Sequence, residues 1–224
     1  MGRNNVVTLD SSASKGEASD TLNFSVNVNN ENSFLLLGIG NIGGVEMNAT
    51  NSTIRLNGVD MNHLVSMNQS SNSFTSIWYY KNPPTGSVSI SGGFVSPFEK
   101  VGIALVYTGA TLATPLFNST GSDSATTLSL PITVSIGESR LVGFWTSTSA
   151  KSPSSGTTEI TELSFGGVPV DVSAAESTSI LSNGSQSIEQ THSGGQWSGA
   201  VCVLAPGFIM SGQPAYTGGA GFMY

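Results

Sequence analysis

The chain has 224 residues, of which 9% are charged, with 14 acidic residues against 7 Lys and Arg and a formal net charge of -7. Ser, Thr, Asn and Gly together make up nearly half of it. So few basic residues cannot neutralise a phosphate backbone, which excludes a nucleic-acid-binding protein. Recurrent apolar runs exclude a disordered chain, and no run approaches the roughly 20 apolar residues that a membrane span needs.

Short runs of β-type residues, separated by turn residues, follow one another along the chain with hardly any helical periodicity. Residues 22–28 alternate between apolar and polar, as a half-buried strand does, and residues 33–39 are almost continuously apolar, as a central core strand is. Asn57-Gly58 lies between two further runs and predicts a tight hairpin. Later strands are predicted at residues 74–80, 87–91, 101–107, 128–136, 140–146, 160–165, 168–172 and 197–205.

These runs predict an all-β fold, an antiparallel β-sandwich or jelly roll of roughly 12 strands. We expect one domain over residues 1–206, with no internal repeat and no linker. Residues 207–224 form a Gly-rich C-terminal arm that carries Tyr216, Phe222, Met223 and Tyr224. Bulky apolar residues in an extended segment indicate an assembly arm that docks on a neighbouring subunit; the alternative is a frayed tail.

The sharpest motif match is G-x-G-x-x-G at residues 38–43, directly after an apolar strand. In dinucleotide-binding proteins this motif works because a helix N-terminus follows it and holds the pyrophosphate. Residues 45–53 are instead β- and turn-forming. We therefore expect no nucleotide site.

The residue types that carry catalysis or bind metals are thinly spread. His63 and His192 are far apart and have no partner at ligand spacing, so solvent-exposed histidines are expected rather than a metal site. Cys202 lies in an apolar run, which favours a buried thiol. Glu159 and Glu162 lie close together, as a glycosidase pair would, but a solvated strand edge explains them better. We expect no catalytic residue, no metal and no cofactor.

Aromatic side chains offer one binding alternative. Trp78, Tyr80 and Trp145 are candidates for a platform on which a host-surface glycan stacks. Trp78 and Tyr80 point to the same side of a strand. The competing interpretation places these rings in the core.

The compartment follows from three features. The chain has one cysteine, no signal peptide is visible, and the Ser/Thr/Asn-rich composition is typical of proteins that work outside cells. A virion protein made in the host cytoplasm and released by lysis fits all three. An extracellular assembly whose signal segment has been trimmed is the alternative.

Several blocks together resemble a family of small β-sandwich proteins encoded by tailed phages and some bacteria. The blocks are FLLLGI (34–39), NGVDM (57–61), SIWYYKNPPTG (76–86), YTG (107–109), TPL (114–116), RLVG (140–143) and WSGAV (197–201). The resemblance implies a jelly-roll-like sandwich in a virion or surface context and transfers no catalytic residue. The Gly-rich segment after residue 206 departs from the family pattern.

The first functional hypothesis is therefore a non-enzymatic virion structural protein. It would be an accessory or decoration subunit on the capsid or tail of a bacteriophage, a homo-oligomer that docks on other virion proteins through its termini. The alternatives are a carbohydrate-binding or receptor-binding module and an extracellular filament subunit.

Overall fold

The computed structural model describes residues 3–4, 6–69, 73–122, 125–167, 170–178, 181–193 and 195–209, and these form strands without a helix. The strands are β1 (Arg3–Asn4), β2 (Thr8–Val28), β3 (Phe34–Ile42), β4 (Ser52–Leu56), β5 (Val59–Asp60), β6 (Asn62–Gln69), β7 (Ser73–Lys81), β8 (Gly86–Thr108), β9 (Leu116–Ser122), β10 (Thr127–Val134), β11 (Arg140–Ser147), β12 (Lys151–Pro153), β13 (Thr157–Phe165), β14 (Val170–Ser177), β15 (Gly184–His192), β16 (Trp197–Leu204) and β17 (Phe208–Ile209).

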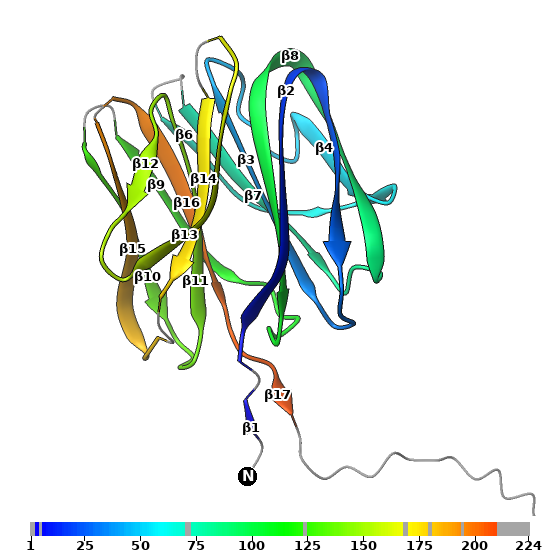
Figure 1. Ribbon diagram of the computed structural model, residues 1–224, viewed down its shortest axis with the longest axis vertical. Helices are drawn as coiled ribbons and strands as arrows, with labels where there is room; N and C mark the ends of the chain where they lie inside the picture. The colour runs from blue at the N-terminus through cyan, green and yellow to red at the C-terminus, as the bar shows by residue number, and fades with distance from the viewer. Residues whose placement is uncertain are drawn as a thin grey trace, which may run out of the picture.

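The strands stack as layers seen edge-on in Figure 1. A three-stranded sheet, β10-β15-β12, covers one face of a five-stranded sheet, β13-β14-β11-β16-β9. The other face of that sheet packs on a seven-stranded sheet containing β6, β7, β3, β8 and β2. A third core lies on the far side of the seven-stranded sheet, beneath β4 and the first part of β8.

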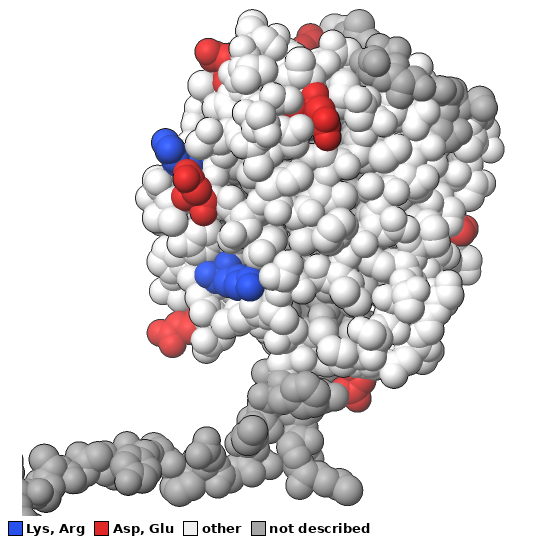
Figure 2. All heavy atoms as spheres, turned by 180° about the vertical axis from the view of Figure 1, so that it is seen from behind, with Lys and Arg blue, Asp and Glu red and all other residues white. Residues whose placement is uncertain are grey.

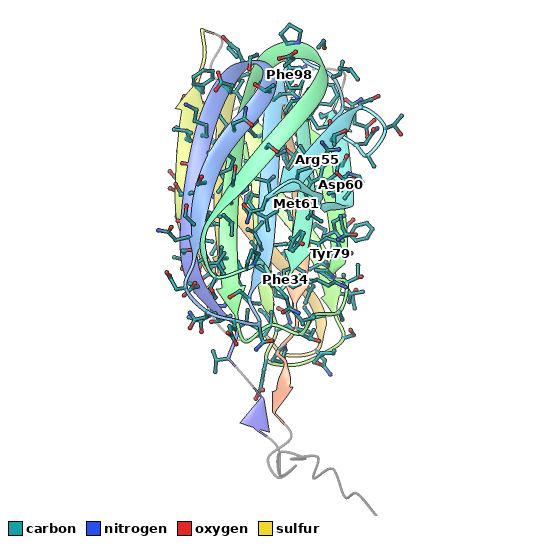
Figure 3. The ribbon with its side chains drawn as sticks, turned by 90° about the vertical axis from the view of Figure 1, so that its right-hand side faces the viewer. Phe34, Arg55, Asp60, Met61, Tyr79 and Phe98 are labelled. Atoms are coloured by element: carbon teal, nitrogen blue, oxygen red, sulfur yellow. The ribbon has the colours of Figure 1, made fainter. Side chains whose placement is uncertain are left out.

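The seven-stranded sheet closes over its own core because its two longest strands bend. β2 and β8 pair along nearly their whole length, but Ser19 lies opposite Phe98 while Thr21 lies opposite Gly93. This bulge turns both strands, as bulges do. The second part of β2 and the first part of β8 then form an outer layer with β4 and β5, on which Arg55 and Asp60 lie paired in Figure 3.

The same pattern of strand pairing occurs twice along the chain. In the first half, β3 pairs with β7 and with the end of β8, β7 pairs with β6, and β2 pairs with β8. In the second half, β11 pairs with β14 and β16, β14 with β13, β9 with β16, and β10 with β15. The two halves also contact each other through equivalent strands: β6 packs against β9, and β13 packs against β2. The chain therefore contains an internal structural repeat whose halves face each other, contrary to the expectation of no internal repeat.

The repeat is also faintly present in the sequence. TLNFSVNV at residues 21–28 corresponds to TLSLPITV at residues 127–134, and both are followed by a five-residue turn. Asn32 and Glu138 have positive φ values of 56° and 65°. The serines that follow, Ser33 and Ser139, are fully buried, and each donates a hydrogen bond to the carbonyl three residues earlier. Both pairs are 106 residues apart.

Small and hydroxyl side chains let the two halves approach closely. A Cβ added at Gly38 would lie 2.0 Å from the Phe144 ring, so only glycine fits there. At one end of the interface, the Thr75 hydroxyl contacts Thr146 Oγ1 at 2.7 Å and Ser198 Oγ at 2.8 Å. All three hydroxyl residues are buried, and their mutual bonds satisfy them.

The all-β, antiparallel prediction is confirmed, and the Asn57-Gly58 hairpin is present with positive φ at both residues. A single sandwich or jelly roll of about 12 strands is not confirmed, because the strands run from β1 to β17 and the long ones pass from layer to layer. The polar strands β6, β9, β12 and β15 and the first half of β2 were not predicted. The glycines of the G-x-G-x-x-G motif lie in and after β3, with no helix following them.

Charged side chains are sparse on the face that Figure 2 shows. Two lysines, Lys100 and Lys151, are buried. Lys100 donates to the carbonyl oxygens of Ser19 and Phe98, and its ammonium lies 4.9 Å and 4.6 Å from the ring centres of Phe94 and Phe98. Burial lowers the pKa of Lys100.

No helix long and apolar enough to cross a membrane occurs among the residues that the structure describes.

Candidate functional site

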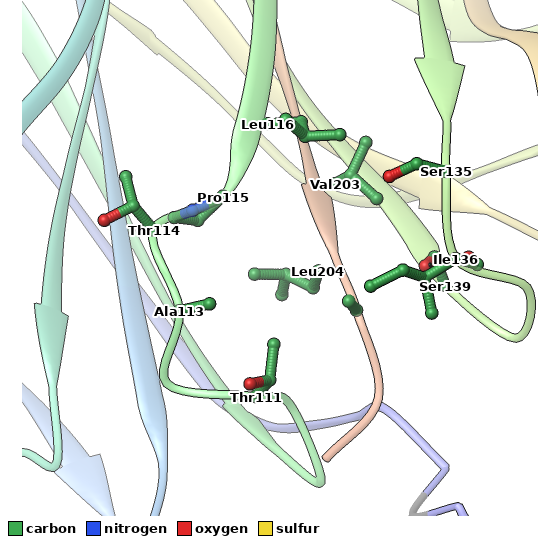
Figure 4. Close-up of a pocket in the computed structure, with 11 residues that line it drawn as sticks. Thr111, Ala113, Thr114, Pro115, Leu116, Ser135, Ile136, Ser139, Val203 and Leu204 are labelled. Atoms are coloured by element: carbon green, nitrogen blue, oxygen red, sulfur yellow. Dashed lines mark hydrogen bonds between the residues drawn. The ribbon is translucent and has the colours of Figure 1, made fainter. Parts of the chain in front are cut away.

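A pocket of about 220 Å³ opens where the connection between the halves enters β9. Figure 4 shows its lining, which comes from three parts of the chain. The connection and β9 supply Ala113, Pro115 and Leu116, the β10–β11 turn supplies Ile136, and the end of β16 supplies Leu204. Further lining residues are Thr111, Thr114, Ser135, Ser139, Val203 and Ala205.

The pocket continues into a shallower groove of about 460 Å³ between the edges of β9 and β10. Leu116 and Ser135 border both. The Asn118 amide bridges the groove with a 2.6 Å hydrogen bond to the Pro131 carbonyl. We call the pocket and groove together the β9 groove. Its lining contains no Asp, Glu, Lys or Arg.

Three large apolar side chains around the β9 groove are unusually exposed. Leu116 is 49% exposed, Phe117 50% and Ile136 42%. Scattered exposed apolar residues are ordinary, but adjacent ones beside a pocket indicate an interaction surface.

The repeat provides an internal comparison for this surface. In the register of the strands, Leu116 lies opposite Val203 and Phe117 opposite Cys202. The corresponding places in the first half are Ser11, opposite Val106, and Ser12, opposite Leu105. Thus two polar positions on the first edge are replaced by two exposed apolar side chains on the second.

In the first half, hydrogen bonds close the space that corresponds to the β9 groove. Asp10 accepts a 3.1 Å bond from the Asn29 backbone N–H and a 2.7 Å bond from the Asn30 side chain. Ser11 donates to the Asn27 carbonyl. The two halves therefore share a topology but differ at this edge. Asp10 and Ser11 tie it to the neighbouring segment of the chain in the first half, whereas in the second half the Asn118–Pro131 hydrogen bond crosses a groove beside the exposed Leu116 and Phe117.

The β9 groove is suited to binding and carries no group for proton transfer. Its buried hydroxyl, Ser139, is engaged with the Ile136 carbonyl at 2.5 Å. Among the described residues no group of three or more His, Cys, Asp or Glu could hold a metal ion.

The two acidic residues considered as a glycosidase pair lie elsewhere, on the edge strand β13. Glu162 accepts a 3.3 Å bond from the buried Lys151 ammonium, which also donates to the Asp171 carbonyl at 2.8 Å. Burial lowers the pKa of Lys151, while burial and the nearby Glu162 raise that of Glu159. Lys151 thus links β12 to β13 through its ion pair with Glu162, a contact that the sequence pattern did not indicate.

The aromatic rings proposed as a glycan platform do not share a surface. Trp78 is 3% exposed in the core under β4, with its indole N–H bonded to Ser76 Oγ. Trp145 is fully buried in a different core and donates to the Leu128 carbonyl. Tyr80 is only partly buried and packs against the first of these cores. The interpretation of the two tryptophans as core residues fits their burial.

The histidines and the cysteine have ordinary surroundings. His192 is buried, not solvent-exposed as expected, and its Nε2 lies 2.7 Å from the Ala125 carbonyl oxygen. His63 is partly buried against the Trp78 ring, and burial lowers its pKa. Cys202 is buried as predicted, in the core between the two halves, and its burial raises the pKa of the thiol.

The predicted assembly arm is the remaining candidate. Its residues Tyr216, Phe222, Met223 and Tyr224 lie outside the described residues. The chain is followed to β17, which pairs with β1 in a small ribbon that projects from one end of the layers in Figure 1.

Sequence reasoning missed the β9 groove. The available signal was Pro115-Leu116-Phe117, an apolar triplet between polar runs, which lacks strand alternation and was therefore not predicted as a strand. Comparison with protein-family models, with curated proteins and with solved structures found no match. The phage-family resemblance therefore remains a prediction.

Proposed function

We propose that the protein is a non-enzymatic structural subunit that associates with copies of itself, in the accessory virion role expected from its sequence. On this proposal each half of the chain is a β-sandwich, jelly-roll-like unit. The two are joined into one rigid block by their shared core. Such a block suits a subunit that neighbours surround, because a surface with few charges has few groups to desolvate.

The observation that carries the proposal is the unguarded edge of β9. Exposed strand edges pair with other strands unless charges, prolines or bulges prevent it. On the corresponding edge, β2 carries Lys15 and Glu17, and the edge strand β10 contains Pro131. β9 has no charged residue and exposes Leu116 and Phe117.

Two other edge strands, β6 and β5, resemble β9 in part. β6 also lacks Asp, Glu, Lys and Arg, but its apolar residues Leu64 and Val65 are buried at 8% exposure each. The edge strand β5 exposes Val59 but also carries Asp60. Among the edge strands whose side chains the structure describes, β9 is therefore the one that exposes large apolar residues and carries no charged residue. The two tryptophans are buried and cannot contact a glycan, so they do not support the glycan-binding alternative, and nothing in the fold favours it.

The proposal is tested with the full chain and a charge placed on each edge. Phe117→Lys places a cation on the open edge, and Ser12→Lys places one at the matching position of the other half. Analytical ultracentrifugation over a wide concentration range should show association of the unmodified chain and of Ser12→Lys, but not of Phe117→Lys. Electron microscopy of the associated protein separates a closed ring or shell from a filament. A chain that stays monomeric at all concentrations would overturn the proposal.

A further inference from the structure

We infer that the β9 groove receives residues 210–224 of a second copy of this chain. This inference rests on the proposed self-association and names its two contacting parts. The donor is the segment that follows β17, and the acceptor is the open edge of the second half.

The chemistry of the two parts matches. Residues 210–224 contain no charged residue and carry Tyr216, Phe222, Met223 and Tyr224 among glycines. The groove lining is also free of charged residues and is apolar at Pro115, Leu116, Ile136, Val203 and Leu204. An apolar segment placed against these residues removes exposed side chains of both partners from water, at about 25 cal/mol per Å² of buried apolar surface.

The lengths of the two parts also match. The donor segment has 15 residues and reaches about 50 Å when extended. β9 has seven residues, which corresponds to about 23 Å of strand. A strand added to β9 therefore uses about half of the segment and leaves the rest to span the distance between subunits. Glycines and other small side chains allow the segment to lie flat against the edge, and main-chain hydrogen bonds supply affinity in this mode of recognition.

The starting point of the segment favours a second copy over the chain's own groove. Ala205 lines the pocket, but the chain then turns away: Gly207 donates to the Gly109 carbonyl, and β17 pairs with β1 in the projecting ribbon. Figure 1 shows this ribbon leading away from the layers. The ribbon thus presents the segment to a neighbour.

The first half of the chain explains why one acceptor exists and not two. Its corresponding space is closed by the hydrogen bonds of Ser11 to the end of β2 and of Asp10 to the turn after β2. A strand entering there would have to break these bonds and bury the Asp10 carboxylate, which is unfavourable without a compensating partner.

The experiment combines two full-length variants that are each defective on one side. Leu116→Lys blocks the acceptor, and Phe222→Lys with Met223→Lys blocks the donor. Each alone should associate at least about tenfold more weakly than the unmodified chain, because a lysine is buried without a partner. Mixed together, they should form one-to-one pairs and nothing larger, since each mixture contains one intact donor and one intact acceptor. The control is Ser12→Lys, at the matching position of the first half, which should not reduce association by more than about twofold.

The outcomes separate this inference from the proposed function. Normal association of the donor variant, with loss in Phe117→Lys, would overturn the inference and leave self-association through β9 standing. Failure of the mixture to form pairs, although each variant is folded by circular dichroism, would also overturn the inference. A monomeric unmodified chain would overturn the proposed function itself.

Discussion

The Tyr107 hydroxyl donates a 2.9 Å hydrogen bond to the Glu176 carboxylate across the interface between the two halves. Arg140 pairs with the same carboxylate from the neighbouring strand. In the first half, the positions that correspond to Arg140 and Glu176 are occupied by Phe34 and Tyr79, whose rings stack with centres 5.6 Å apart. One repeated contact is therefore polar at one place and aromatic at the other.

This polar contact predicts alkaline sensitivity. Burial and the neighbouring Glu176 raise the pKa of Tyr107 well above its usual value of 10.0. Because the folded protein holds this proton more tightly than the unfolded chain, the stabilisation is complete below about pH 10 and is lost as the pH rises above it. In Tyr107→Phe we expect a free energy of unfolding lower by about 1–2 kcal/mol at pH 7 and a shallower loss above pH 10. Urea unfolding at several pH values measures both, with Tyr80→Phe as the control. Equal alkaline slopes for the unmodified chain and Tyr107→Phe would contradict the assignment.

The close approach at Gly38 predicts a large penalty for one methyl group. Gly38→Ala places a Cβ 2.0 Å from the Phe144 ring and should lower the free energy of unfolding by about 1–3 kcal/mol. Gly93→Ala is the matched control in another strand, since no atom lies within 4 Å of its added Cβ. Denaturant unfolding compares the two, and adding Phe144→Leu to Gly38→Ala should recover part of the loss. Equal stability of the two alanine variants would show that the halves are less tightly packed than described.

The position of Cys202 makes it a reporter of contact between the halves. The thiol lies in the shared core, and burial raises its pKa, so it is protonated and inaccessible. We expect no reaction with a thiol reagent in native buffer and rapid reaction in denaturant, followed by absorbance of the released chromophore. The labelling rate should rise in Gly38→Ala, because that variant loosens the same core. Fast labelling of the native, unmodified chain would contradict the buried position.

The two buried tryptophans should act through stability and not through sugar binding. Trp145→Ala removes a ring from the core between β10 and β11 and should lower the free energy of unfolding by about 3–5 kcal/mol. Trp78→Ala should have a similar effect in its own core. Thermal melting measures the loss, and a glycan array supplies the second readout. A variant that melts normally but loses glycan binding would revive the platform interpretation.

The strands with β-branched or aromatic runs were predictable, and so was the hairpin at Asn57-Gly58, because these signals are local. The repeat was not, since the halves share few identical residues and differ in spacing: Ser33 and Ser139 are 106 residues apart, whereas Ser76 and Ser173, which lie opposite Ile39 and Trp145, are 97 apart. Pairing register is decided by contacts far apart in sequence, which a single sequence does not display.

The burial of charged residues was equally hidden from the sequence. The sequence around Lys100 and Lys151 is typical of lysines exposed to solvent. Both ammonium groups are nevertheless buried, and each donates a hydrogen bond to a backbone carbonyl oxygen. The β9 groove escaped prediction because the exposure of Leu116 and Phe117 depends on how β9 packs against strands far away in the sequence.

Carrying both halves in one polypeptide changes what the edges are allowed to be. In a symmetric dimer of identical units, any residue that opens an edge appears on both sides, so two contact points arise together. In the fused chain, Asp10 closes one edge while Leu116 opens the other. On the proposed self-association, the valency of the surface is therefore one per polypeptide, and growth from it would have a direction.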